Sequence, residues 1–452
     1  MTSADALRRW RSLPSERRAT SLLAIGLVVV LLALPGSQGE GRSGTLGGNE
    51  AGAGAAAAQR LPAAAVTITP DDGARKARPD RPIVVKVANG KLQDVVISNK
   101  GRKIEGDLAA GGTRWESRWT LAPSTKYTVT ATALGKDGKT TTTKSSFRTL
   151  NPAQTVSAFR VAPDNGEKVG VGMPIILGFD QPVHNKKEVE RALEVRMSKP
   201  VEGAWRWMSD QEVVFRTKKY WPRNTKVTMV AHLSGVRAAK NVYGGEDLKT
   251  KFTVGDSVIS TVNAKSHKMT VKKNGKTIRK MPISAGNATK RAYTTTNGIH
   301  LAMSMEYHVV MDSATVGIPK GHPEYYKLDV YHAVRISNSG EYTHSAPWSV
   351  GSQGRANVSH GCVNQSPKNA QWFKEMTRRG DVVIVTGTDR ELEYNNGWGF
   401  WQMSWKTWKK GSAAKLTINP KSSTPTVPAA AAPRPPVAAS PSASPSASPA
   451  VP

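Results

Sequence analysis

The sequence predicts a mainly β protein, in which two β-sandwiches precede a β-rich domain with one helix. Three patterns lead to this prediction. Residues 66–254 consist of short β-type runs separated by turn residues, and the pattern occurs twice. Asn274-Gly275 separates two alternating runs, which is the strongest short signal for a β-hairpin. A helical pattern of any length first appears at 367–379, where apolar residues recur every three positions.

The chain begins with a basic segment and then an apolar one. Residues 1–20 contain five arginines and are predicted to be cytoplasmic, and Leu22–Leu34 is an apolar run. Its 13 residues fit a secretory signal and are short for a membrane span, which needs about 20. No small-residue cleavage site follows closely, so 21–35 is predicted to be either a signal peptide or a membrane anchor. The Gly-, Ala- and Ser-rich residues 36–64 are predicted to form a flexible linker.

Residues 65–150 and 151–255 are two copies of one pattern. Pro70-Asp71-Asp72-Gly73 in the first copy corresponds to Pro163-Asp164-Asn165-Gly166 in the second. Copies of about 90–105 residues with alternating strands are typical of immunoglobulin-like sandwiches. Neither copy contains a cysteine, so we expect no disulfide between the sheets. Four tryptophans are expected to fill the cores rather than to bind ligands: Trp115, Trp119, Trp205 and Trp207.

The chain is strongly basic, with a formal net charge of +30 and a pI of about 10.2. Such a charge suits either nucleic acid or an anionic cell envelope as a partner. No helix-turn-helix, RNA-binding aromatic pattern or zinc spacing is present in the sequence, so we predict no nucleic-acid partner. The scattered histidines lack metal-ligand spacing, and no metal or other cofactor is expected. We predict an extracytoplasmic protein of the cell wall space, anchored in the membrane or secreted.

Cys362 is the only cysteine of the chain and lies in Ser359-His360-Gly361-Cys362-Val363-Asn364. A neighbouring imidazole lowers the pKa of a thiol from about 8.5 toward neutrality, and both His360 and His344 are candidates for this role. Gly361 permits backbone angles that a Cβ forbids, which leaves the amides of Gly361 and Cys362 to face an oxyanion. The alternative is a buried, inert cysteine. The flanking Ser-His-Gly and Asn favour a catalytic nucleophile, and the residues alone do not choose between the two histidines.

This stretch resembles the active-site signature of the L,D-transpeptidases, cysteine enzymes that cross-link bacterial peptidoglycan. His344, a spacer of fourteen residues and Ser359–Asn364 match the family pattern without departure. The segment from His344 to Val350 is similar to the actinobacterial branch, in which tandem immunoglobulin-like domains act as spacers. The resemblance implies that residues 256–388 are a β-rich catalytic domain with a helix immediately after the nucleophile.

The resemblance also implies a mechanism and a partner, the peptidoglycan stem peptide. Cys362 would attack the third residue of a tetrapeptide stem and release D-Ala, and the amine of a second stem would then form a 3→3 cross-link. His344 would be the general base and acid, with its ring oriented by the backbone carbonyl of Ser345. His360 remains the alternative base or a residue that shapes the site. Carbapenems, which acylate the cysteine of this family, would be inhibitors.

Five further positions are implied to contact substrate or to shape its pocket. A lid is expected at 311–329, where glycines and prolines disfavour regular structure. The five positions are Met311, Tyr326, Trp348, Ser359 and Asn364.

The C-terminal region has two parts. In residues 389–412, Trp398, Trp401, Trp405 and Trp408 have the spacing of one helix face. They are expected to pack back onto the catalytic domain, as in the C-terminal subdomain of this branch. Residues 413–452 are rich in Pro, Ala and Ser and are predicted to be disordered.

Two alternative functions stay open at this point. The same site with another acceptor would be an L,D-carboxypeptidase or an enzyme that attaches proteins to peptidoglycan. A non-catalytic wall-binding module, with Cys362 in a structural role, is an alternative of another class. A carbapenem adduct on Cys362 would distinguish an enzyme from such a module.

Overall fold

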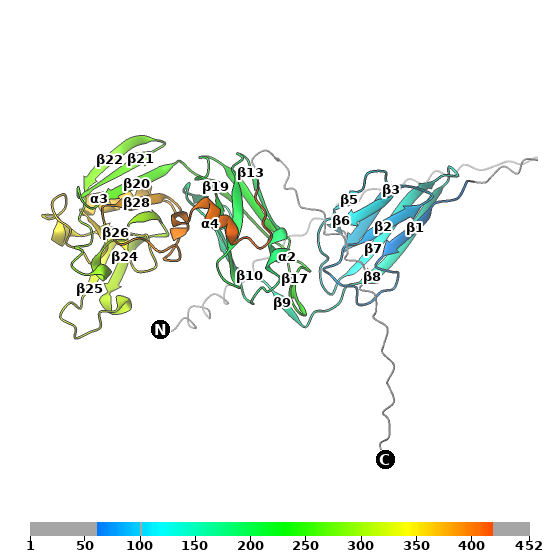
Figure 1. Cartoon of the computed structure of the whole chain (residues 1–452), viewed down its shortest axis with the longest axis horizontal. Helices are drawn as coiled ribbons and strands as arrows, with labels where there is room; N and C mark the ends of the chain where they lie inside the picture. The colour runs from blue at the N-terminus through cyan, green and yellow to red at the C-terminus, as the bar shows by residue number, and fades with distance from the viewer. Residues whose placement is uncertain (1–60, 100–101, 419–452) are drawn as a thin grey trace, which may run out of the picture. The chain divides into compact units, whose positions relative to one another are not determined.

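The computed structural model describes residues 61–99 and 102–418. The predicted signal peptide or anchor, almost all of the predicted linker, and residues 419–452 of the predicted disordered tail lie outside the described residues. Within the described part, no helix has the length and apolar character that a membrane crossing requires. The described part is mainly β, as predicted, with few and short helices (Figure 1).

The first sandwich contains two four-stranded sheets, with strand orders β1-β2-β6-β5 and β4-β3-β7-β8 (Figure 1). Residues on β7 alternate between buried and more exposed, because successive side chains of a strand point to opposite faces. The inward set packs with residues such as Ile83, Val85 and Ile97. The strands are β1 (Ala65–Thr69), β2 (Val84–Ala88), β3 (Gly90–Asn99), β4 (Arg102–Lys103), β5 (Gly106–Leu108), β6 (Arg114–Ser117), β7 (Lys126–Gly135) and β8 (Thr140–Arg148).

The second sandwich pairs the sheets β10-β12-β15-β14 and β11-β19-β16-β13, beside a small sheet β17-β18-β9. It also holds α2 (Lys186–Arg191), a helix that the sequence did not reveal because six residues give too short a periodic pattern. The strands are β9 (Gln154–Val156), β10 (Ala158–Ala162), β11 (Lys168–Val169), β12 (Ile175–Phe179), β13 (Leu193–Met197), β14 (Gly203–Trp207), β15 (Glu212–Thr217), β16 (Lys226–Ala231), β17 (Arg237–Ala239), β18 (Val242–Gly244) and β19 (Leu248–Val254).

The tryptophans of the sandwiches behave largely as predicted. Trp115, Trp205 and Trp207 are buried in the cores, whereas Trp119 is only partly buried.

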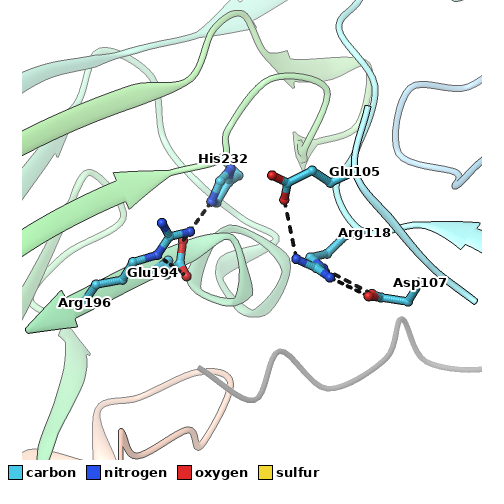
Figure 2. A network of polar contacts seen from close by, with 6 residues as sticks. All are labelled: Glu105, Asp107, Arg118, Glu194, Arg196 and His232. Atoms are coloured by element: carbon cyan, nitrogen blue, oxygen red, sulfur yellow. Dashed lines mark hydrogen bonds and ion pairs between the residues drawn. The ribbon is translucent and has the colours of Figure 1, made fainter. Parts of the chain in front are cut away.

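Each of the two sandwiches also carries a cluster of charged residues (Figure 2). In the second sandwich, the Glu194 carboxylate accepts two hydrogen bonds from Arg196 at 2.8 and 2.7 Å and lies 3.2 Å from His232. In the first sandwich, Arg118 pairs with Glu105 and Asp107 at the surface, and such exposed ion pairs contribute little to stability. The Glu194 carboxylate of the second cluster is instead buried, so its hydrogen bonds to Arg196 and His232 compensate the cost of removing it from water.

The predicted catalytic domain consists of the sheet β22-β21-β20-β28-β23 and the sheet β24-β25-β26-β27, with α3 packed against β25 and β26. The predicted hairpin is confirmed, since Asn274 and Gly275 both have positive φ, as a two-residue I′ turn requires. The elements are β20 (Val258–Asn263), β21 (Lys268–Lys273), β22 (Lys276–Pro282), η2 (Arg291–Tyr293), β23 (Gly298–Leu301), β24 (Ser304–Asp312), η3 (Ser313–Val316), β25 (Lys327–Arg335), β26 (Tyr342–Ser345), η4 (Pro347–Ser349), β27 (Val363–Gln365), α3 (Pro367–Met376) and β28 (Val382–Thr386).

The tryptophan-rich segment does not form the single helix that its spacing predicts. It is divided into η5 (Gly399–Gln402) and α4 (Trp405–Lys410), and Ser404 caps α4 by accepting a hydrogen bond from the Thr407 amide. Its indoles donate to the second sandwich: Trp401 to the Gly172 carbonyl, Trp405 to Glu202 and Trp408 to the Ala204 carbonyl, each at 2.9 Å. The prediction that these tryptophans pack onto the catalytic domain is therefore wrong for these three.

The physical reason for this packing is a buried cation on the second sandwich. Arg216 of β15 is 3% exposed, and its guanidinium lies 4.8 Å from the ring centres of Trp401 and Trp408 and 5.6 Å from that of Trp405. Aromatic faces attract a desolvated guanidinium. The segment also touches the catalytic domain, where Gln402 accepts a hydrogen bond from the Ile299 amide at 2.8 Å. It therefore links the second sandwich to the catalytic domain.

Candidate active site

The nucleophile turn, residues 359–362, ends where β27 begins. Gly361 has a φ of 126°, in the region that favours glycine. Ser359 Oγ accepts a hydrogen bond from the Gly361 amide at 3.1 Å and donates one to the Cys362 carbonyl at 2.6 Å. The serine therefore holds the turn from within. Because the Gly361 amide is occupied in this way, it is not free for the oxyanion role expected from the sequence, and the Cys362 amide is the candidate that remains.

Cys362 itself is partly buried, and its thiol donates to the Gly340 carbonyl at 3.6 Å. Burial raises the pKa of the thiol to about 12; the backbone N–H of Tyr342 opposes this shift, and the charge of Glu341 adds to it. We expected the imidazoles to bring this pKa toward neutrality, and in the resting site they do not. The reason is that desolvation of the sulfur is the largest influence on it. Burial therefore favours the protonated form of the Cys362 thiol.

His344 lies on β26, which pairs in parallel with β27 so that His344 is opposite Asn364. Its side chain is 3% exposed, and Nδ1 donates to the Ser345 carbonyl at 2.8 Å. A carbonyl oxygen can only accept, so the proton is on Nδ1 and the lone pair is on Nε2. Burial lowers the pKa of His344 to about 4, which keeps the ring neutral at physiological pH. The ring of His344 is thus held by the backbone carbonyl of the next residue, Ser345.

The pair is close in the fold but not in hydrogen-bond contact. His344 and Cys362 lie on neighbouring parallel segments, and among the hydrogen bonds of residues 61–99 and 102–418 none joins them. The thiol instead points to Gly340. In the resting site the thiol and the imidazole therefore have separate backbone partners, Gly340 and Ser345.

His360 has a different environment from His344. It is exposed, and its ring lies between two tyrosines, 4.5 Å from the Tyr293 ring centre and 5.1 Å from that of Tyr326. A ring in this position contacts the lid rather than the core of the site. The two histidines therefore differ in burial and in partners: the ring of His360 packs between tyrosines, and that of His344 is held inside the domain by the Ser345 carbonyl.

The predicted lid residues line this side of the turn. Tyr326 is partly buried, its amide donates to Ser313 Oγ at 3.0 Å, and burial raises the pKa of its phenol to about 12. Met311 is partly buried near the end of β24, opposite Leu328. The lid is tied to the body of the domain by the Glu324 carboxylate, which accepts from Tyr293 at 2.6 Å and from Lys290 at 2.5 Å.

The two remaining predicted positions differ from each other. Trp348 on η4 is 55% exposed, with its ring centre 6.1 Å from that of His344, so it presents a free aromatic face next to the base. Asn364 is 3% exposed and donates to Ser349 Oγ at 3.0 Å. Its backbone also exchanges hydrogen bonds with Ser284. Asn364 therefore supports the scaffold of the site, and Trp348 is available to substrate.

The sequence analysis did not identify Glu341, a buried acidic residue close to the nucleophile turn. Glu341 is 4% exposed and accepts hydrogen bonds from the Thr296 amide at 2.7 Å and the Thr296 hydroxyl at 2.6 Å. The tie of Glu324 to Lys290 and Tyr293 was also missed. An acidic residue among strand-type residues three positions before His344 was the only signal for Glu341 in the sequence.

The arrangement as a whole suits acyl transfer by a thiol. It contains a protected thiol, a neutral imidazole with a free Nε2 lone pair, a nearby amide and an aromatic surface. Groups of three or more possible metal ligands are absent from the part of the chain that the structure describes.

Comparison with known proteins identifies two kinds of domain in the chain. Residues 74–237 match the model of a bacterial Ig domain, and residues 257–385 match that of the L,D-transpeptidase catalytic domain. The chain is 39% identical to L,D-transpeptidase 2 of Mycobacterium tuberculosis, over 77% of this chain and 85% of that protein. It is 34% identical to L,D-transpeptidase 5 of the same species, over 78% of each. A solved structure of LdtMt1 in complex with imipenem shares 38% identity, covering 52% of this chain and all of that one, with a TM-score of 0.45.

These matches define a protein with an immunoglobulin-like region followed by an L,D-transpeptidase catalytic domain. The chain belongs to the L,D-transpeptidase family.

Proposed function

We propose that the protein is a peptidoglycan L,D-transpeptidase that forms 3→3 cross-links through a thioester on Cys362. The donor is a tetrapeptide stem, and the acceptor is the side-chain amine of a second stem. Membership of the family supports this reaction class. The parallel pairing of β26, which carries His344, with β27, which directly follows Cys362, supports the assignment of the nucleophile and the base.

Acylation begins from the neutral pair. His344 Nε2 takes the proton of the thiol as Sγ attacks the carbonyl carbon of the third stem residue, and the new C–S bond places negative charge on the carbonyl oxygen. The Cys362 amide is our candidate donor to that oxygen, since amides placed in this way stabilise developing charge. His344 then gives its proton to the terminal D-Ala nitrogen, the C–N bond breaks, and D-Ala leaves as an amine.

Deacylation repeats the proton transfers in the opposite direction. The acceptor amine attacks the thioester carbon, and His344 accepts a proton from its nitrogen. The C–S bond breaks, the sulfur leaves as a thiolate, and the protonated His344 returns the proton to it. The products are a cross-linked peptide and the neutral pair, so no cofactor is needed.

One observation carries the assignment of the base. The contact of His344 Nδ1 with the Ser345 carbonyl favours the tautomer that carries its proton on Nδ1, and this leaves the lone pair of Nε2 to accept a proton. The pKa of about 4 means that His344 is not trapped as a cation before substrate arrives.

The remaining parts of the chain are assigned roles consistent with this reaction. The immunoglobulin-like domains would hold the catalytic domain away from the cytoplasmic membrane, to which the N-terminal segment would attach if it is uncleaved. The positive charge of the chain suits an anionic envelope. The protein would therefore act outside the cytoplasm.

Mass spectrometry of the products from tetrapeptide stems tests this function. We expect peptide dimers joined between the third residues, with release of D-Ala, and no such dimers with Cys362→Ala. Tripeptide monomers alone would instead indicate an L,D-carboxypeptidase. Unchanged substrate with the folded wild-type protein would support a wall-binding module.

A further inference from the structure

A buried carboxylate lies directly behind the nucleophile turn. Glu341 is 4% exposed and follows Gly340, whose carbonyl accepts the hydrogen bond of the Cys362 thiol. A Cβ added to Gly361 would lie 3.9 Å from Glu341 Cγ, so this side chain packs against the turn itself. Buried carboxylates are uncommon because removing their charge from water is costly. This one therefore requires an explanation that the acyl-transfer steps do not supply.

The partners of Glu341 hold it firmly but do not neutralise it. Thr296 donates to it twice, through its amide at 2.7 Å and its hydroxyl at 2.6 Å. The Glu341 amide donates to Ser337 Oγ at 3.1 Å, and its carbonyl accepts from the Ile336 amide at 2.9 Å. Among the ion pairs of the described residues, none includes Glu341. The carboxylate is thus held by the amide and hydroxyl of Thr296, while the carbonyl of the preceding Gly340 contacts the sulfur.

The same short segment also holds the nucleophile turn. Thr295 donates its hydroxyl to the Gly361 carbonyl at 2.7 Å and accepts from the Gly286 amide at 2.8 Å. Consecutive threonines therefore connect the turn that carries Cys362 with the turn that carries Gly340 and Glu341. Both threonines are 0% exposed.

The titratable groups around Glu341 come from three elements. They are Cys362 of the nucleophile turn, Tyr342 of β26, and His300 of β23, which reaches Glu341 through Thr296. His300 Nε2 is 2.9 Å from the Thr296 carbonyl and Nδ1 is 3.2 Å from the Ile336 carbonyl. His300 is 0% exposed.

We propose that Glu341 is a positioning residue of the active site, which fixes the Gly340 carbonyl against Cys362 and places a carboxylate behind the nucleophile turn, where its charge disfavours the thiolate in addition to burial. The inference rests on the proposed role of Cys362 as nucleophile. A thiol held in this way is protected from adventitious alkylation and oxidation, which act on the thiolate. In agreement with this arrangement, the charge of Glu341 adds to burial in raising the pKa of the thiol.

The test is the rate of Cys362 alkylation by iodoacetamide as a function of pH. This reaction needs no transpeptidase activity, so failure of the inference is distinguishable from failure of the proposed function. Glu341→Gln removes the charge and keeps the size of the side chain. We expect the midpoint of the alkylation profile to move to lower pH by about one pH unit, because a nearby like charge disfavours the thiolate. Glu375→Gln removes an exposed carboxylate from α3 and should leave the midpoint unchanged.

A second variant guards against loss of folding. Glu341→Leu replaces the buried charge by an apolar side chain, a change that is often tolerated. It should produce the same shift to lower pH in protein that unfolds cooperatively. A midpoint equal to that of the wild type in either folded variant would overturn the proposal, and so would a shift of the same size in Glu375→Gln.

Discussion

The active site and the tryptophan-rich segment both bury ionisable groups, and they treat them in opposite ways. Around Arg216, three indole rings and the Met403 carbonyl accept the cation; burial lowers its pKa to about 10, and it stays charged at neutral pH. Around Cys362 and His344, burial shifts both pKa values toward the neutral forms. The scaffold compensates its buried cation, whereas burial in the site favours the neutral forms of Cys362 and His344.

The largest effect should come from the base of the site. His344→Ala is expected to slow acylation by a carbapenem by about 10²–10⁴-fold, because it removes general base catalysis. The rate is measured by intact mass over time. His360→Ala is the matched control, and its exposed ring predicts a much smaller loss. Wild-type acylation in His344→Ala would assign the base to His360 instead.

A substitution in the tryptophan-rich segment should lower the stability of the fold and leave the acylation of folded protein intact. Trp408 is 0% exposed, and truncation of such a side chain costs about 3–5 kcal/mol. We expect Trp408→Ala to lower the free energy of unfolding by this amount in denaturant titrations, while the folded fraction is still acylated. Trp348→Ala, which truncates an exposed ring, should leave stability nearly unchanged. Equal losses in the two variants would contradict the comparison.

Asp381, next to β28, is a buried carboxyl group with one oxygen unpaired within the described part of the chain, and its effect on stability should depend on pH. It is 2% exposed, burial raises its pKa from 3.8 to about 7, and Oδ1 has no partner among the described residues. The folded state therefore binds more protons than the unfolded state between these pH values, and stability falls as pH rises through this window. Asp381→Asn should increase the free energy of unfolding by about 1–4 kcal/mol at pH 8 and have little effect at pH 4.

The control for Asp381→Asn is Asp256→Asn, because the pKa of Asp256 is shifted in the opposite direction. The pKa of Asp256 is lowered, first by Asn274 and then by Lys273, so its ionised form favours the folded state above the unfolded pKa. Asp256→Asn should therefore not stabilise the protein at pH 8. An equal gain for Asp381→Asn at both pH values would show that the removal of charge is not the cause.

The smallest effect is expected at the lid. Lys290→Met removes the ammonium that donates to Glu324, and the pKa of Glu324 is lowered chiefly by that hydrogen bond. Hydrogen exchange of amides in 313–326 should become faster, while acylation changes by less than about tenfold, since this contact is exposed. Unchanged exchange in these residues would mean that Tyr293 and the ring of His360 hold the lid without Lys290.

The sequence identified those features that depend on neighbours in the chain. The spacing of His344 and Cys362 pointed to the nucleophile and base, Asn274-Gly275 to the hairpin, and the 367–379 pattern to α3. Glu341 was missed because its burial depends on Thr296, which is 45 residues away. Contacts between residues far apart in the chain also explain why the packing of the tryptophans was mispredicted. Trp405 and Trp408 bind residues of the second sandwich that lie about 200 positions earlier.

The ionisation of the site was also beyond the sequence. An imidazole near a thiol suggests a lowered thiol pKa, and only the fold determines whether the two groups meet or are desolvated separately. Here the thiol contacts Gly340 and the imidazole contacts Ser345. The expected oxyanion role of the Gly361 amide failed for the same reason. The sequence does not show that this amide donates its hydrogen bond to the Ser359 hydroxyl.

The central claim is that the sulfur of Cys362 carries the acyl group. The most direct measurement is the intact mass of the protein after acid quenching of its reaction with a tetrapeptide donor in the absence of acceptor. We predict a mass increase equal to the tripeptide acyl group, located on Cys362 by peptide mapping and missing in Cys362→Ala. An adduct that persists in Cys362→Ala, or its complete absence from folded wild-type protein that releases D-Ala, would contradict the account.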